Sequence, residues 1–335
     1  MPHAARPARQ PVPQGTAQTA TVLSGIEYSG AGGTEWSGDV MGDMERAAQA
    51  ANVLAAWCAL RDMSALSKDA LRQEAGLSDD TADLFVLFGG GVTGTVETLA
   101  AAMRAGVASR YAIVGGRGHA TYWLDRAIER LRDGGETLPA PRVASEAEML
   151  DALLFARHGL HADFLETRST NCGNNITYLL DLLEGEGCVP EGVILSQDAV
   201  MQRRMDVTWR RQVMDRPLFA STRVVNWPAY EAELAVRDGS LVWAQAPEGI
   251  WPMEKYLQLL LGEVDRLTDD EGGYGPRGRG FVVHVDVPAE VRAAADELRA
   301  ACGEAGRAPD ERFGQTKDGA GLTRRNDATA GLFEG

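Results

Sequence analysis

The segment that decides the predicted fold is residues 82–119, ADLFVLFGGGVTGTVETLAAAMRAGVASRYAIVGGRGH. An apolar run of strand length at 84–88 ends at three glycines, and a second apolar run at 111–114 ends at Gly-Gly-Arg-Gly-His. A helix-compatible segment lies between the two runs, so the pattern predicts a β-α-β unit. Because the strands of such a unit are parallel, both glycine-rich loops should lie at one edge of the sheet and border a common crevice.

The rest of the chain continues to alternate strands with helices. Glu148 follows Ser145 at the spacing of a capping box, which predicts a helix from there to about residue 159. Further strands are predicted at 163–166, 193–195 and 219–225, and further helices at 42–63, 122–133, 176–185, after Asp198 and at 250–267. This alternation predicts an α/β fold with a parallel sheet that is covered by helices on both faces.

The two ends of the chain differ from its middle in composition. Residues 1–38 are rich in Pro, Ala, Gln, Gly and Thr, and the segment from residue 303 is polar and rich in glycine. We therefore expect a disordered leader at 1–38 and a flexible tail at 303–335. Between them, residues 39–302 should form one α/β domain with an N-terminal helix and a C-terminal helical extension.

The overall composition favours a soluble protein with a small-molecule partner. Of 335 residues, 44% are hydrophobic and 24% charged, and the formal net charge is -15. A negative charge of this size disfavours nucleic acid and anionic lipid as partners. No segment has the apolar length of a membrane span, and the four cysteines form no C-x-x-C pair that would indicate zinc or disulfides. Reduced thiols in a cytoplasm are the expectation.

Four successive strands each end in a glycine-rich or polar loop, and in a parallel sheet these four loops share one edge. Glycines let the backbone approach a ligand, and helix N-termini attract negative charge, so the edge is typical of an anion or nucleotide site. The candidate ligand-binding residues in these loops are Gly89, Gly90, Gly91, Gly115, Gly116, Arg117, Gly118, His119, Ser169, Thr170, Asn171, Gln197, Asp198, Arg203 and Arg204.

Arg203 and Arg204 carry the sharpest argument for an anionic ligand. If Asp198 caps the following helix, both arginines fall within about its first two turns, where the macrodipole disfavours cations. A bound anion would remove this conflict. The alternative is a solvated face or pairing with an acidic neighbour such as Asp206.

Three residues are candidates for catalysis, and each has a structural alternative. His119 is suited to act as acid, base or phosphate contact, or it is a hydrogen-bonded structural histidine. Glu146 is a ribose contact or base, or a carboxylate favoured by its place in the first helical turn. Asp198 is a ribose or metal ligand, or a plain N-cap. Residues 169–171 similarly fit either a ligand or a helix cap.

Several common enzyme signatures are missing from the sequence. There is no G-x-S-x-G, no H-E-x-x-H and no G-x-x-x-x-G-K-[ST] motif. The run FGGGVTG departs from the dinucleotide fingerprint at its third glycine, and no acidic residue ends the second strand. These departures disfavour an ordinary NAD enzyme or an ordinary methyltransferase.

Five motifs between about residues 84 and 291 resemble those of the bacterial YdcF proteins, a branch of the family that includes SanA and ElyC and whose domain has no assigned function. They are GGRGHAT (115–121), STNCGNN (169–175), QDAVMQRR (197–204), WPMEKY (251–256) and GYGPRGRGFVVHVD (273–286). The resemblance implies a Rossmann-like domain with extra helices, and S-adenosylmethionine binding has been proposed for this branch. Where relatives carry Glu-Asn this chain has Asn174-Asn175, so Asn175 is the position that transfers. Membrane-anchored relatives are linked to cell-envelope metabolism.

Two functions follow as the main expectations, with a sensor without chemistry as a third. The first is a cytoplasmic protein that binds a nucleotide-type small molecule, such as S-adenosylmethionine, in the crevice. The second is a hydrolase or transferase for a phosphorylated metabolite. In either case we expect the loop GYGPRGR to fold over the crevice and to add the positive charge of Arg277 and Arg279, unless it is an exposed surface loop. No metal, reaction or oligomeric state is assigned.

Overall fold

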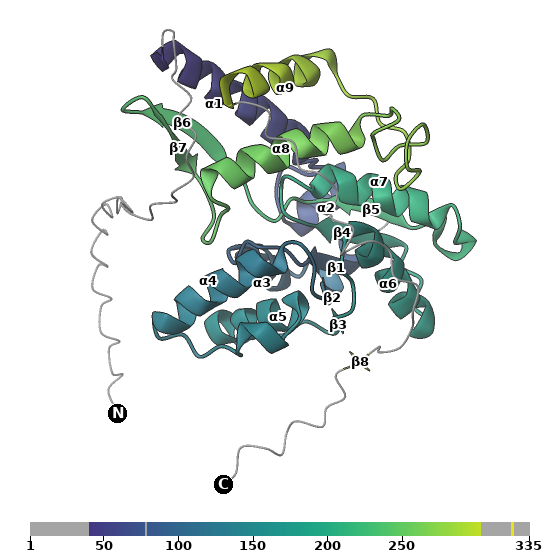
Figure 1. Ribbon diagram of the computed structural model, residues 1–335. Coiled ribbons are helices and arrows are strands. Elements are labelled where there is room, and N and C mark those ends of the chain that lie inside the picture. Colours follow the sequence, from purple (N-terminus) through teal and green to yellow (C-terminus); the bar gives the residue numbers. More distant parts are fainter. Residues whose placement is uncertain (1–39, 78, 303–322, 325–335) are drawn as a thin grey trace, which may run out of the picture. The chain divides into compact units, whose positions relative to one another are not determined.

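Five parallel strands form the centre of the computed structural model, which describes residues 40–77, 79–302 and 323–324 (Figure 1). In space the strands follow the order β5-β4-β1-β2-β3. Their bounds are β1 Ala82–Phe88, β2 Ala108–Val114, β3 Phe164–Glu166, β4 Gly192–Ser196 and β5 Arg223–Asn226, and a two-residue strand, β8 (Thr323–Arg324), pairs antiparallel with β3. The predicted Rossmann-like α/β fold is confirmed.

The strands are continuous apolar runs because both faces of the sheet are covered. In β1, Phe85 and Leu87 belong to the hydrophobic cluster that contains Leu99 and Leu150 of the helices on one face. Their neighbours Leu84, Val86 and Phe88 belong to a second cluster with residues of α6 and α7. Figure 1 shows α3 (Thr95–Ala105), α4 (Thr121–Asp133) and α5 (Glu146–His158) on one side of the sheet and α6 (Cys172–Gly185) and α7 (Gln202–Val213) on the other.

Local signals in the sequence set several helix ends. The predicted capping box is present: Ser145 accepts from the Glu148 amide, and the Glu148 carboxylate accepts from Ser145. The predictions for two other elements were shifted. Helix α7 begins at Gln202 rather than directly after Asp198, and β5 begins at Arg223 because Phe219 closes a short 3-10 helix, Pro217–Phe219.

A third group of elements packs beside the sheet and its helices. It consists of α1 (Val40–Cys58), α2 (Lys68–Glu74), α8 (Met253–Leu267), α9 (Ala289–Cys302) and a hairpin of β6 (Glu233–Arg237) and β7 (Ser240–Gln245). Figure 1 shows α1, α8, α9 and the hairpin side by side, and α1 contacts the other three. The sequence interpretation missed this hairpin, although Asp238-Gly239, both with positive φ, is a strong two-residue turn signal.

The described helices include none with the length and apolarity needed to cross a membrane. The predicted leader at 1–38 lies outside the described residues, and so does the predicted tail at 303–335 apart from β8.

The strand order places a reversal between β1 and β4. The chain proceeds from β1 through β2 to β3 on one side, then returns to β4 on the other side of β1 and continues to β5. The loops that leave β1 and β4 at their carboxyl ends therefore run in opposite directions. In open α/β sheets this is the place where ligands bind.

Candidate functional site

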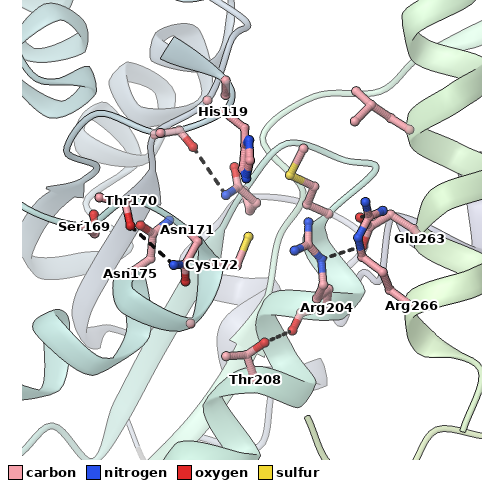
Figure 2. A pocket seen from close by; sticks show the side chains of 18 of the residues that line it. His119, Ser169, Thr170, Asn171, Cys172, Asn175, Arg204, Thr208, Glu263 and Arg266 are labelled. Atoms are coloured by element: carbon pink, nitrogen blue, oxygen red, sulfur yellow. Dashed lines mark hydrogen bonds and ion pairs between the residues drawn. The ribbon is translucent and has the colours of Figure 1, made fainter. Parts of the chain in front are cut away.

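A cavity of about 400 Å³ opens at this edge of the sheet, and all four predicted loops contribute to its lining. Several of its residues are shown in Figure 2. The predicted residues that line it are Gly89, Gly90, Gly118, His119, Glu146, Ser169, Thr170, Asn171, Asn175, Gln197 and Arg204. Those that do not line it are Gly91, Gly115, Gly116, Arg117, Asp198, Arg203 and Arg277. The predicted convergence of the loops is therefore present, and binding of a ligand by these residues remains a prediction.

Most of the loop glycines make room for protein atoms. A Cβ on Gly89 would lie 2.6 Å from the Glu146 carboxylate, and a Cβ on Gly115 would lie 3.0 Å from the Gly89 Cα. A Cβ on Gly116 would lie 2.3 Å from the Ser169 carbonyl oxygen. These glycines thus allow the ends of the strands and the edge loops to pack closely, which the sequence analysis had attributed to the approach of a ligand.

Gly90 is different from its neighbours. The nearest atom to a Cβ placed on it is the Gln197 side-chain oxygen, at 3.8 Å, whereas a Cβ on Gly91 would collide with Trp251 at 2.3 Å. Gln197 itself joins the loops of β1 and β4, because its Nε2 donates to the Gly89 carbonyl at 3.4 Å and its Oε1 accepts from the Asp198 amide at 2.6 Å. Gly90 is the position where a backbone can approach a ligand at this reversal.

Arg117 forms hydrogen bonds with other residues of the protein and does not line the cavity. Its guanidinium donates to Asp125 at 2.6 Å and to the carbonyls of Pro141 and Ala144 at 2.8 and 2.6 Å. The side chain therefore fixes the connection that leads into α5, which positions Glu146 at the start of that helix.

Asp198 is a buried structural carboxylate. It accepts from the Tyr230 hydroxyl at 2.5 Å, from the Trp251 indole N–H at 2.7 Å and from the Val200 amide at 3.0 Å. Burial raises the pKa of Asp198, and these donors oppose the rise. The predicted helix cap or ligand contact is corrected: Asp198 anchors Trp251, and it is Trp251 that lines the cavity.

Arg203 and Arg204, in the first turn of α7, have different partners, and only Arg204 lines the cavity. Arg203 donates from Nε to the Trp57 carbonyl at 2.7 Å, and its guanidinium carbon lies 4.9 Å from the centroid of a Trp57 ring, outside the cavity. Arg204 lines the cavity and donates from Nε to Glu263 at 2.6 Å. Protein partners thus resolve the conflict with the helix dipole that the sequence analysis assigned to an anion. The partner predicted as the alternative, Asp206, pairs with Arg210 instead.

Helix α8 supplies a wall that the sequence interpretation missed. Its residues Lys255, Leu259, Glu263 and Arg266 recur at three- and four-residue spacing and line the cavity. Glu263 is fully buried, with Arg204 on one carboxylate oxygen and Arg266 at 3.3 Å on the other. Figure 2 shows this Arg-Glu-Arg group on one side of the cavity. In the sequence, charged residues on the apolar stripe of the predicted helix at 250–267 were the signal that could have indicated this cavity wall.

The loop after α8 brings Arg279, and not Arg277, to the cavity, together with Tyr274 and Phe281. The rings of these aromatic residues meet edge to face with centroids 5.4 Å apart. Arg277 is held on the outside by its backbone amide, which donates to Asp269 at 2.8 Å. The predicted addition of positive charge by this loop therefore falls to one of its two arginines.

Glu146 is a carboxyl group of the cavity lining whose environment changes its pKa strongly. It is 6% exposed, and the Thr121 hydroxyl donates to it at 2.5 Å. Burial raises the pKa of Glu146 from 4.5 to about 7, although the Thr121 hydrogen bond and the charge of Arg117 oppose the rise. A carboxyl group of this kind is able to exchange a proton near neutral pH. His119 lines the same cavity on the loop that precedes Thr121.

The loop after β3 forms the predicted helix cap and also borders the cavity. Asn171 caps α6 by accepting from the Asn174 amide at 3.0 Å, and the Ser169 hydroxyl accepts from the Gly116 amide at 3.1 Å. Thr170 donates to the Asn174 side-chain oxygen at 3.0 Å. The capping alternative is confirmed for Asn171, while Asn175, one residue beyond the capped turn, lines the cavity.

The lining is aromatic where α4 and the start of α8 meet. Trp123 and Trp251 both line the cavity, with ring centroids 6.2 Å apart and ring planes at 78°. Within the described part of the chain, no three His, Cys, Asp or Glu side chains are grouped as a metal site requires. No protein-family model matches the chain.

Proposed function

We propose that this chain binds a nucleotide-type small molecule in the cavity, with S-adenosylmethionine, whose carboxylate is its only anionic group, as the first ligand to test. The observation that carries the proposal is the position of the cavity at the reversal between β1 and β4, with the loops of four parallel strands around it. Dinucleotide- and mononucleotide-binding α/β proteins use this position because helix N-termini and strand ends meet there.

The charges of the lining favour an anion. The whole chain has a formal charge of -15, yet Arg204, Lys255, Arg266 and Arg279 line the cavity against the carboxylates of Glu146 and Glu263. With its pKa near 7, Glu146 is partly neutral at neutral pH, so the positive charges are in excess. A site built only for stability in an acidic protein would not gather cations around an open cavity.

The aromatic residues favour a ligand with a planar ring system. Trp251 precedes α8 and packs against Trp123, whereas Arg266 lies in the last turn of α8, so the two tryptophans and Arg266 are at opposite ends of that helix; Tyr274 and Phe281 lie at the arginine end. A nucleotide has the same polarity, with a base that stacks on aromatic rings and an anionic group at the other end. The resemblance to YdcF proteins agrees with this proposal, since its motif residues Asn175, Arg204 and Trp251 all line the cavity.

Thermal melting with a ligand panel tests the proposal. At about 100 times the dissociation constant, a ligand raises the free energy of unfolding by about 2.7 kcal/mol, or roughly 5–10 °C in Tm for a domain of this size. S-adenosylmethionine or a nucleotide should produce such a shift. If no nucleotide-type compound shifts Tm at millimolar concentration, the proposal is wrong.

Two arginines of one loop provide a matched pair of variants. Arg279→Met removes a cation from the cavity lining, whereas Arg277→Met removes a cation that is also exposed but lies outside the lining. We expect the first variant to weaken binding of an anionic ligand about two- to fivefold, since exposed charges contribute about 0.3–1 kcal/mol, and the second to leave it unchanged. Equal effects of both variants would show that only long-range charge matters.

Glu146 favours a second candidate function, the hydrolysis or transfer of a phosphate group. A carboxyl group with a pKa of about 7 in the cavity is suited to general acid-base catalysis. Glu146→Gln keeps the shape and removes the proton exchange. For a substrate found in a phosphatase screen, this variant should retain binding and lose at least 100-fold in kcat. Unchanged turnover in the variant would show that Glu146 is not the acid-base group, and only the absence of any substrate in the screen would leave ligand binding as the function.

A further inference from the structure

The N-terminal end of α6 presents hydrogen-bond donors to the cavity. Cys172 and Gly173, its first two residues, both line the cavity, and their amides donate to no other residue in the described ranges. The third amide of the helix, that of Asn174, is satisfied by the cap residue Asn171. The two remaining amides and the helix dipole favour a negative group at this point.

Asn175 is an independent sign of a ligand at the same place. It is only 7% exposed, it lines the cavity, and its side-chain amide makes no hydrogen bond to another residue of the described chain. Side-chain amides in such buried positions are normally paired, and the cavity is the side from which a partner can reach Asn175. The neighbouring Asn174 follows this rule, since its side-chain oxygen accepts from Thr170 and Asn171.

Arg204 faces this helix end from the opposite wall. Its Nε donates to Glu263, while its two terminal nitrogens have no acceptor among the described residues. Figure 2 shows the Arg204 guanidinium directed towards Cys172, and Asn175 lies on the same side of the cavity as Cys172. Burial raises the pKa of the Cys172 thiol, and the nearby charge of Arg204 opposes that rise. The thiol between them is therefore neutral at neutral pH and adds no competing negative charge.

We propose that the first turn of α6, Asn175 and Arg204 together bind a phosphate monoester group of the ligand. The inference deepens the proposed function and rests on it, because it states which end of a nucleotide-type ligand lies at α6 and what that end must carry. The Cys172 and Gly173 amides, the Asn175 side chain and the terminal nitrogens of Arg204 would be the donors.

The number of donors and the local charge distinguish a phosphate from a carboxylate. Two amides, one side-chain amide and two guanidinium nitrogens exceed what the two oxygens of a carboxylate use well, and match the three terminal oxygens of a phosphate monoester. Four cations line the cavity, Arg204, Lys255, Arg266 and Arg279, against the carboxylates of Glu146 and Glu263, so at least two positive charges are in excess. A dianion balances these two. The site should therefore prefer AMP to adenosine and to S-adenosylmethionine.

Asn175→Asp is the decisive variant. Aspartate keeps the shape of asparagine, and at the fourth residue of α6 it still lies near the positive end of the helix dipole, so the protein should fold, but its charge repels a phosphate. Gln73→Glu, on the exposed face of α2, adds the same charge away from the cavity and serves as the control. Binding of inorganic phosphate is followed by 31P NMR line broadening, and binding of AMP, adenosine and S-adenosylmethionine by calorimetry, all on the full chain.

We expect phosphate to show 31P line broadening with the wild type and with Gln73→Glu, and to show none with Asn175→Asp. In Asn175→Asp, the Kd for AMP should be at least tenfold weaker, whereas the Kd for adenosine should change less than twofold. Phosphate or AMP binding that survives Asn175→Asp would overturn the inference. So would an AMP affinity no higher than that of adenosine, while binding of adenosine or S-adenosylmethionine would leave the proposed function standing.

Two further outcomes separate the inference from the function on which it rests. Phosphate binding that depends on Asn175, without binding of any nucleoside compound, would retain the phosphate site and refute a nucleotide-type ligand. Absence of binding by all four compounds would refute both. Melting temperatures of the unliganded variants verify that each one folds.

Discussion

Glu146→Gln should change how the stability of the protein depends on pH. The pKa of Glu146 is about 7 in the folded chain, against 4.5 for an ordinary glutamic acid. At about 1.4 kcal/mol per pKa unit, this difference corresponds to about 3.4 kcal/mol. Because the folded state holds the proton more tightly, this stabilisation is fully present below pH 4.5 and is lost as the pH rises through 7. About 2.5 kcal/mol of the loss falls between pH 5 and pH 8.

Glutamine does not titrate, and its side-chain oxygen can still accept from the Thr121 hydroxyl. The free energy of unfolding of Glu146→Gln, relative to wild type, should therefore rise by about 2.5 kcal/mol between pH 5 and pH 8. Urea unfolding of both proteins at the two pH values measures this, and the comparison cancels the titration of all other groups. If the difference between the two proteins is the same at both pH values, Glu146 is not buried as a neutral acid and its assignment as an acid-base group loses its basis.

Gly89→Ala and Gly90→Ala are a matched pair, because a Cβ at Gly89 would overlap a carboxylate at 2.6 Å whereas the nearest atom at Gly90 is 3.8 Å away. We expect thermal melting to show a loss of about 1–3 kcal/mol for the first and almost none for the second, and equal losses would disprove the packing role. Arg204→Met should lower the free energy of unfolding by about 3–5 kcal/mol because it leaves Glu263 buried beside a single arginine. The double variant Arg204→Met/Glu263→Met should recover part of that loss, and a double variant less stable than the single one would contradict this account.

The sequence was sufficient to predict the fold and the convergence of four loops on one cavity. Apolar runs that end in glycines, a capping box at Ser145 and regular alternation are local patterns, and local patterns determine which elements form. Parallel strands must end at a common edge, so the convergence of the four loops also followed from the sequence. The missed hairpin was an oversight of the same local kind, since Asp238-Gly239 is visible in the sequence.

Side-chain roles could not be predicted in the same way because their partners are distant in the sequence. Arg203 stacks on Trp57, Arg204 pairs with Glu263, and Asp198 holds Trp251. The separations are 146, 59 and 53 residues. The helix dipole argument identified an electrostatic conflict between the arginines and the start of α7, but such a conflict shows only that the arginines need an anionic or hydrogen-bonding partner. Whether the partner is a ligand or the protein depends on tertiary contacts that no local pattern encodes.

The Arg204-Glu263-Arg266 group explains how an acidic protein can maintain a cationic cavity. Two arginines without a carboxylate would repel each other in a partly buried wall, and two arginines with two carboxylates would leave no charge for a ligand. A single buried carboxylate between them fixes both guanidinium groups and leaves one positive charge unbalanced. Surface charge of the opposite sign is screened by salt over about 8 Å, whereas charges that line a cavity act on a ligand at contact distance in a less polar medium. The negative net charge would therefore not oppose the proposed anionic ligand once it has entered, and its specificity would rest on the few side chains that line the cavity.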